Sequence, residues 1–226
     1  MRSTFAILRV VFGAAIAVAA FSQLAHTLAV RSAQGVDAPW FYVQNFFSFF
    51  TVDSNLLSAA VLLIGAVALA RSPREGRWLT LLRLASTSYM TVTLIVYNLL
   101  LRGIQLPEGE TLWWSNEILH VVGPAFVVLD WLFAPGRNRL GFRDIWLVVI
   151  FPVVWAAYTL IRGVFVVDVQ TGQPWYPYPF LNPGISPNGY LSVAFYVLLI
   201  TGIFLAVAAA AVWVSRRGPA VEAAAD

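Results

Sequence analysis

Long apolar stretches, separated by short polar segments, dominate the hydropathy pattern of this chain. Five stretches hold roughly 18 or more nearly uncharged residues, and a sixth reaches that length with one arginine inside it. A helix of this length spans the hydrocarbon core of a bilayer, so each stretch predicts a membrane-spanning helix. The predicted spans are residues 5–30, 46–70, 78–101, 113–134, 145–166 and 190–213.

The amino-acid composition also indicates a membrane protein. Hydrophobic residues make up 60% of the 226 residues and charged residues 11%, which is too apolar for a soluble domain of this size. We predict an all-α polytopic membrane protein with a single six-helix domain over residues 1–217 and a short disordered tail over 218–226. A signal peptide shares the features of the first stretch, in which Arg2 and Arg9 accompany an apolar run, but the length of that run favours a span.

The arginines predict the orientation in the membrane. All 14 basic residues are arginines, and ten of them fall at the termini or in the second and fourth connections, which lie on one side. Those ten are Arg2, Arg9, Arg71, Arg74, Arg77, Arg137, Arg139, Arg143, Arg216 and Arg217. By the positive-inside rule we expect a multipass protein of the cell membrane with both termini in the cytoplasm. The net charge of +3 reflects this topology, and we expect no nucleic-acid partner.

The connection between the fifth and sixth spans differs from a simple linker. It reads VDVQTGQPWYPYPFLNPG over residues 167–184, with four prolines and four aromatic residues. Proline restricts the backbone and aromatic rings favour the membrane interface. We expect a structured cap at the outer interface.

Polar residues collect on one face of the second predicted span, in the stretch FFSFFTVDSNLL. Residues at i, i+3, i+4 and i+7 share a helix face. Ser48, Thr51, Asn55 and Ser58 follow this spacing, and Ser54 lies beside them. Asp53 points elsewhere. Unsatisfied polar groups are costly in the bilayer, so we expect this face to meet another polar cluster.

The fourth span supplies such a cluster at the same depth. Asn116 and Glu117 share a helix face with His120, and Pro124 predicts a kink because it removes a backbone hydrogen bond. His120 is seven residues inward from Trp113, and Thr51 is six inward from Asn45. At ~1.5 Å per residue, both lie roughly 10 Å below the outer interface.

The outer halves of the remaining spans are also richer in polar residues than the inner halves. Tyr97 and Arg102 lie near the outer end of the third span, and Arg162 lies near the outer end of the fifth. Together these positions predict a polar chamber open toward the outer leaflet. Either arginine is a candidate to hold an anionic head group or a free carboxylate.

One interpretation of the chamber is catalytic. A hydroxyl nucleophile needs a base, and histidine suits that task near neutral pH. Thr51 is the candidate nucleophile and His120 the candidate base; Asp53 or Glu117 would orient the imidazole. Candidate substrate-binding or oxyanion-binding residues are Asn55, Asn116, Ser48, Ser54, Tyr97, Arg102 and Arg162.

A second interpretation involves no chemistry. Serine and threonine often bond to carbonyls of their own helix, and asparagine and histidine often bridge helices in membranes. The same residues therefore also fit a lipid-binding protein or a small-molecule transporter. With no cysteine and two histidines in the chain, we expect neither a metal site nor a cofactor.

Three motifs resemble, in order, the androgen-induced family of multipass membrane proteins and its bacterial relatives. They are FFTVDSN at the start of the second span, NEILHVVGPAFVVLDWLF on the fourth, and WYPYPFLNP before the last. Animal members of that family are threonine hydrolases that cleave fatty acid esters of hydroxy fatty acids and require one intramembrane threonine and one histidine. The resemblance assigns these roles to Thr51 and His120. The resemblance does not identify the substrate; taken together with the chamber, we expect hydrolysis of a lipid ester that enters sideways from the outer leaflet.

Overall fold

The membrane-spanning helices lie close to where the hydropathy pattern predicts them. The structure is a computed structural model that describes residues 1–104 and 109–217. Within these residues, six helical segments are long and apolar enough to cross a membrane, which confirms the all-α polytopic prediction. They are Arg2–Ala33, Phe50–Arg71, Arg77–Leu101, Trp113–Phe133, Phe142–Phe165 and Tyr190–Arg217. The tail predicted to be disordered, residues 218–226, lies outside the described residues.

Three of the six spans are continuous α-helices and three contain short segments of another helix type. The continuous ones are α1 (Arg2–Ala33), α3 (Phe50–Arg71) and α8 (Tyr190–Arg217). The third span joins α4 (Arg77–Val96) to the π-helix η1 (Tyr97–Leu101). The fourth joins α5 (Trp113–Glu117), the π-helix η2 (Ile118–Val122) and α6 (Gly123–Phe133). The fifth joins the 3₁₀ turn η3 (Phe142–Asp144) to α7 (Ile145–Phe165).

The second span begins later than its apolar pattern predicts. A separate short helix, α2 (Pro39–Phe46), ends before the span, and the chain turns at residues 47–49 before α3 begins at Phe50. Ser48 therefore lies in the turn, so the prediction that it shares one helix face with Thr51 was wrong. Hydropathy does not register the break because four of the five residues from 46 to 50 are phenylalanines. The break places Thr51 in the first turn of α3.

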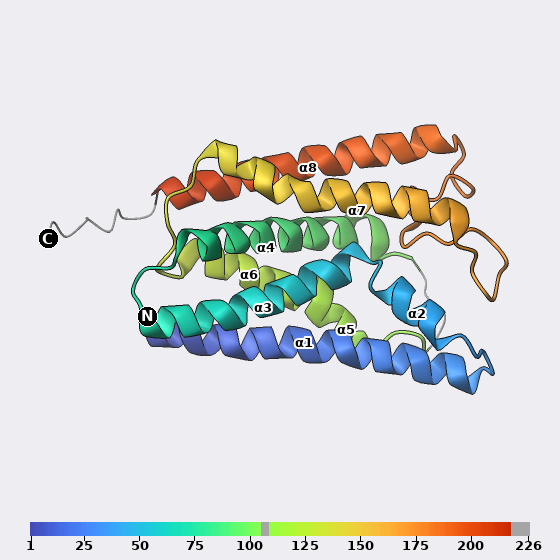
Figure 1. The fold of residues 1–226 in the computed structure, drawn as a ribbon, viewed down its shortest axis with the longest axis horizontal. Helices are drawn as coiled ribbons and strands as arrows, with labels where there is room; N and C mark the ends of the chain where they lie inside the picture. Colours follow the sequence, from blue (N-terminus) through green and yellow to red (C-terminus); the bar gives the residue numbers. More distant parts are fainter. Residues whose placement is uncertain (105–108, 218–226) are drawn as a thin grey trace, which may run out of the picture.

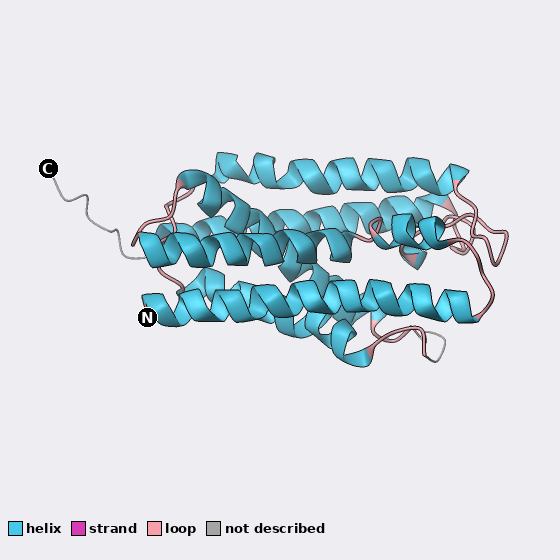
Figure 2. Ribbon diagram, turned by 60° about the horizontal axis from the view of Figure 1, so that its bottom comes forward, coloured by secondary structure: helices cyan, strands magenta, loops and turns pink. Residues whose placement is uncertain are grey.

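The helices run side by side along the long axis of the molecule (Figures 1 and 2). α1 packs along α3, and α4 has α3, α6 and α8 as neighbours. One apolar cluster includes Ile16, Leu62 and Phe126, and a second includes Leu84 and Phe204. α4 contributes to both clusters, with Met90 in the first and Leu84 in the second, and is therefore the central helix of the bundle.

The fifth and sixth spans are the least buried. In their most apolar windows 17% and 22% of residues are buried, against 56% in the span formed by α3. Lipid is the solvent for such apolar side chains in a membrane. α7 and α8 therefore present most of their surface to lipid.

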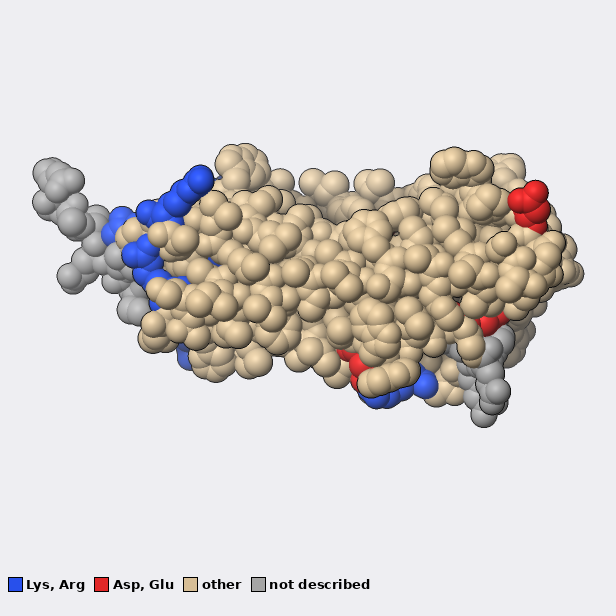
Figure 3. Space-filling model, turned by 90° about the horizontal axis from the view of Figure 1, so that it is seen from below, with Lys and Arg blue, Asp and Glu red and all other residues tan. Residues whose placement is uncertain are grey.

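Charged side chains lie mainly at the two ends of the bundle. Figure 3 shows basic side chains gathered at the end where α1 begins and α8 ends, and between the ends a surface that is uncharged except for one group of acidic and basic side chains at its lower edge. This distribution is typical of a protein that spans a bilayer.

Four charged residues form a buried ring near the basic end. Arg9 bonds to Glu75 and to Asp130, each at 2.8 Å, and Arg83 bonds to the same two carboxylates, each at 2.7 Å. Arg9 is fully buried and the other three are no more than 4% exposed. The ring joins α1, α4 and α6 to the connection between α3 and α4. Arg9 is thus a buried structural residue, whereas its position in the sequence had placed it among the cytoplasmic arginines.

Candidate functional site

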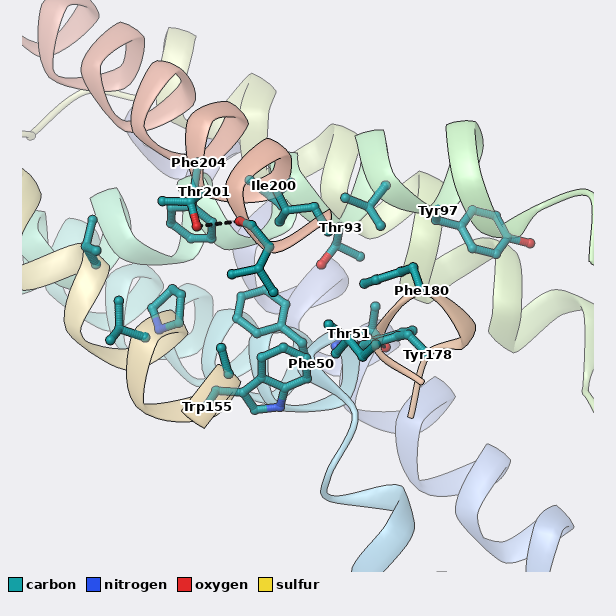
Figure 4. A pocket seen from close by; sticks show the side chains of 18 of the residues that line it. Phe50, Thr51, Thr93, Tyr97, Trp155, Tyr178, Phe180, Ile200, Thr201 and Phe204 are labelled. Atoms are coloured by element: carbon teal, nitrogen blue, oxygen red, sulfur yellow. Dashed lines mark hydrogen bonds between the residues drawn. The ribbon is translucent and has the colours of Figure 1, made fainter. Parts of the chain in front are cut away.

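An apolar pocket of about 210 Å³ lies among α4, α7 and α8, in the half of the bundle away from the basic end. Its wall is formed by residues such as Val92, Pro152 and Phe204, and the connection between α7 and α8 covers one end with Tyr178 (Figure 4). Lining residues on α7 and α8, among them Val153, Thr201 and Leu205, are also exposed on the surface of the bundle. The pocket is therefore open between these two helices, on the side that faces lipid.

Thr51 lies at the polar end of this pocket. Its Oγ1 is 3.2 Å from the hydroxyl oxygen of Tyr178, and its backbone N–H donates to the same oxygen at 3.2 Å. The backbone donor is unpaired within the helix because Thr51 belongs to the first turn of α3. One phenol therefore contacts both polar groups that Thr51 directs toward the pocket.

Tyr178 comes from the cap between α7 and α8. This connection is folded: the Asp168 carboxylate accepts two backbone N–H bonds, and the backbone of Trp175 bonds back to that of Val166 at the end of α7. The 3₁₀ turn η4 (Pro179–Leu181) follows. Burial raises the pKa of Tyr178 to about 12, so the phenol keeps its proton at neutral pH.

His120 lies at the centre of η2. Its Nδ1 is 2.9 Å from the backbone carbonyl of Asn116, which can only accept a hydrogen bond. The neutral imidazole therefore carries its proton on Nδ1 and has a lone pair on Nε2. The ring stacks on Tyr97, with centroids 4.2 Å apart. Tyr97 is the first residue of η1, so two π-helical segments meet at this contact, and such segments are frequent at functional sites.

The π-helix η2 has a local cause in the sequence. Pro124 has no backbone N–H, so the carbonyl four residues before it loses its usual partner. The structure accommodates this by widening the preceding turn, where the sequence predicts a kink. Gly123 allows α1 to approach, because a Cβ atom there would lie 3.1 Å from the side chain of Ile16.

Asn55 connects the Thr51 and His120 segments. Its Nδ2 donates to the carbonyl of Thr51 at 2.8 Å and to that of Leu119, the neighbour of His120, at 2.9 Å. No hydrogen bond joins Thr51 to His120 in the described part of the chain, and His120 is not among the residues that line the pocket. Tyr97 connects the pocket with His120, because its side chain lines the pocket and its ring stacks on the imidazole. Its hydroxyl points away from the pocket in Figure 4 and accepts a bond from Asn116.

Comparison with models of protein families, with curated proteins and with solved structures finds no match for this chain.

The remaining hydroxyl groups predicted for the site connect helices. Ser48 bonds to the Tyr158 hydroxyl at 3.0 Å, which joins the turn before α3 to α7. Ser54 bonds to the Thr93 hydroxyl at 3.3 Å, which joins α3 to α4. Thr93 also lines the pocket. Both serines thus hold the pocket walls together.

The charged residues predicted for the site lie around it. Arg102 pairs with Glu117 at 2.8 Å on the surface, and Arg162 bonds to Asn45 at 2.6 Å. Asp53 is half-buried, and its side chain makes no hydrogen bond or ion pair with the described residues. Neither Asp53 nor Glu117 hydrogen bonds to His120, so the residues predicted to orient the imidazole do not do so in this structure. The carbonyl of Asn116 does instead.

Sequence reasoning did not identify Tyr178 as part of the site. The available signal was the aromatic and proline-rich motif WYPYPF, which predicts a rigid cap but does not say which ring points inward.

Among the described residues, no group of three or more His, Cys, Asp or Glu side chains could hold a metal ion.

Proposed function

We propose that this protein hydrolyses lipid esters within the membrane, with Thr51 as nucleophile and His120 as base. The observation that carries this proposal is the position of the Thr51 hydroxyl at the polar end of an apolar pocket that opens toward lipid. An acyl chain would occupy the apolar wall, and its ester group would then lie near Thr51. The motifs that resemble the androgen-induced family support the same two residues.

In the proposed reaction, Oγ1 of Thr51 attacks the ester carbonyl carbon and its proton passes to Nε2 of His120. The imidazolium then returns that proton to the leaving alcohol oxygen, which leaves an acyl ester on Thr51. A water molecule, activated by His120, releases the acyl group as a carboxylic acid and restores Thr51. Catalytic hydrogen bonds are often long before substrate binds, so the resting separation of Thr51 and His120 is compatible with this sequence of steps.

The proposal includes an orientation. The basic end of the bundle, where α1 begins and α8 ends, would lie in the cytoplasm of a cell that carries the protein in its cell membrane. Thr51 and the cap would then face the outer leaflet, and the substrate would enter between α7 and α8.

The test is labelling of the purified protein in bilayers with a fluorophosphonate probe. We expect a covalent adduct that peptide mass spectrometry assigns to Thr51. A His120→Ala protein with the same melting temperature should label about 10²–10⁴-fold more slowly, because the base that removes the Thr51 proton is missing. An adduct on a different residue, or unchanged labelling in the His120 variant, would contradict the assigned roles.

A second candidate function is lipid binding without hydrolysis, in retention or transport. It is favoured by the apolar lining of the pocket and by the absence of His120 from that lining. Both candidates require the pocket to hold an acyl chain, but only hydrolysis produces a free fatty acid and an adduct on Thr51.

Filling the pocket tests the requirement that the two candidates share. Ala156→Trp places an indole in the pocket, whereas Ala157 is exposed on the same helix. We expect native mass spectrometry to detect bound lipid in the wild type and in Ala157→Trp, and several-fold less in Ala156→Trp. Equal lipid occupancy in all three proteins would show that the lipid lies elsewhere.

A further inference from the structure

We infer that Tyr178 is a catalytic residue whose hydroxyl stabilises the oxyanion formed when Thr51 attacks an ester carbonyl. This inference rests on the proposed function and assigns a role for which the sequence offered other side chains, Asn55 and Asn116 among them. Four features of the site carry it.

The first feature is the hydrogen bonding of the phenol. The backbone N–H of Thr51 can only donate, so the Tyr178 oxygen accepts that bond and its own O–H remains able to donate. The same oxygen is 3.2 Å from Oγ1 of Thr51. A carbonyl carbon bonded to Oγ1 would carry its oxygen into reach of the phenol O–H. This donor then lies beside the place where negative charge develops, and the Thr51 N–H holds the phenol oxygen in that position.

The second feature is preorganisation of the ring. Tyr178 is 7% exposed and stacks on Phe180 with centroids 5.2 Å apart and planes 3° apart. Phe49 meets it edge-on at 5.6 Å, and Trp155 lies at 6.0 Å. A donor held in this way needs little reorganisation as the reaction proceeds, which is the condition for electrostatic stabilisation of a transition state.

The third feature is the protonation state of the phenol. Burial raises the pKa of Tyr178, and the nearby Asp53 of α3 acts in the same direction, while the hydrogen bonds from Thr51 oppose them. With a pKa of about 12, the phenol is a donor throughout the range in which an imidazole acts as a base.

The fourth feature is the position of the two asparagines, Asn55 and Asn116, which does not suit them to donate to the oxyanion. Both hydrogens of the Asn55 amide are directed at backbone carbonyls, those of Thr51 and Leu119. The Asn116 amide donates to the Tyr97 hydroxyl at 2.5 Å. Neither asparagine lines the pocket, whereas Tyr178 does. The cap therefore supplies a side-chain donor at the pocket, where neither asparagine lies.

Tyr178→Phe tests this role because it removes the hydroxyl and retains the ring contacts. With a lipid ester as substrate, we expect kcat to fall about 10²–10³-fold, as when one oxyanion donor is removed, and KM to change by no more than a few-fold. The control is Tyr196→Phe, since Tyr196 packs against Phe180 but its hydroxyl makes no hydrogen bond with the described residues. We expect its kcat to equal that of the wild type.

A second measurement does not depend on how well Tyr178→Phe folds. Incorporation of 2,3-difluorotyrosine at position 178 keeps the hydroxyl but makes it more acidic. If the protonated phenol donates to the oxyanion, the alkaline limb of the kcat profile moves to lower pH. A purely structural tyrosine would leave this limb in place.

The outcomes separate this inference from the function on which it rests. If Tyr178→Phe has the kcat of the wild type, or if the alkaline limb does not move, Tyr178 does not stabilise the oxyanion. The proposed hydrolase function would still stand in that case, provided that Thr51→Ala is inactive. Full activity in Thr51→Ala would overturn the proposed function itself.

Discussion

A Thr51→Ala protein is expected to lose ester hydrolysis by roughly 10⁴–10⁶-fold, the range seen when a hydroxyl nucleophile is removed. The proposed covalent step requires the Thr51 hydroxyl, which lies at the polar end of the pocket in contact with Tyr178. The fold is expected to survive, because the Thr51 side chain makes one hydrogen bond, worth about 1 kcal/mol. The measurement is release of free fatty acid from lipid esters by protein reconstituted in bilayers.

The matched control is Thr91→Ala. Thr91 is also a half-buried threonine whose hydroxyl makes one hydrogen bond, to the carbonyl of Thr87 within α4, and it does not line the pocket. We expect wild-type activity from this variant and partial activity from Thr51→Ser, which keeps a hydroxyl at the same place. An alanine variant at position 51 that hydrolyses esters as fast as the wild type would end the proposal.

The second large effect is on stability. Asp130→Ala is expected to lower the free energy of unfolding by about 3–5 kcal/mol, because it leaves Arg9 and Arg83 with an uncompensated positive charge in the interior. Neither guanidinium reaches water, since Arg9 is fully buried and Arg83 is 4% exposed. Denaturant unfolding in detergent micelles would measure the change.

Asp144→Ala is the control for this prediction. Asp144 also pairs with an arginine, at 2.6 Å, but the Arg77 side chain is 60% exposed and remains solvated when its partner is removed. The loss of this pair, and of the bond that Asp144 accepts from the backbone of Gly141, is expected to cost about 1–2 kcal/mol. Equal destabilisation by the two substitutions would mean that the buried ring has no special role in holding α1, α4 and α6 together.

The buried ring of Arg9, Glu75, Arg83 and Asp130 shows that the positive-inside rule does not account for charged residues inside the bundle. Counting arginines by segment treats Arg9 as a cytoplasmic residue of the first span, because the rule refers to loops and helix ends. Arg9 and Arg83 each lie within an apolar helix, and Asp130 lies in a third. An intramembrane charge of one sign implies a partner of the other sign, so the sequence contained a signal for the ring, although not the pairing itself.

The candidate site also contains residues that the sequence identified and one that it did not. Thr51 and His120 were selected from residue type, depth and motif, and the structure brings their segments together through the Asn55 side chain. Tyr178 was not selected, because a cap residue far along the chain reaches Thr51 only when the connection after α7 folds back over the pocket. Local patterns carry no information on such a contact.

The sequence by itself determined the protein class, the number of spans and the approximate ends of most spans. It could do so because a bilayer imposes one strong local requirement, an apolar helix long enough to cross it. Tertiary structure alone decided the break before α3, the pairing within the charged ring, and the contact of Tyr178 with Thr51. Each of these depends on which side chains from distant segments meet, and in a membrane that choice follows from packing and hydrogen bonding between helices.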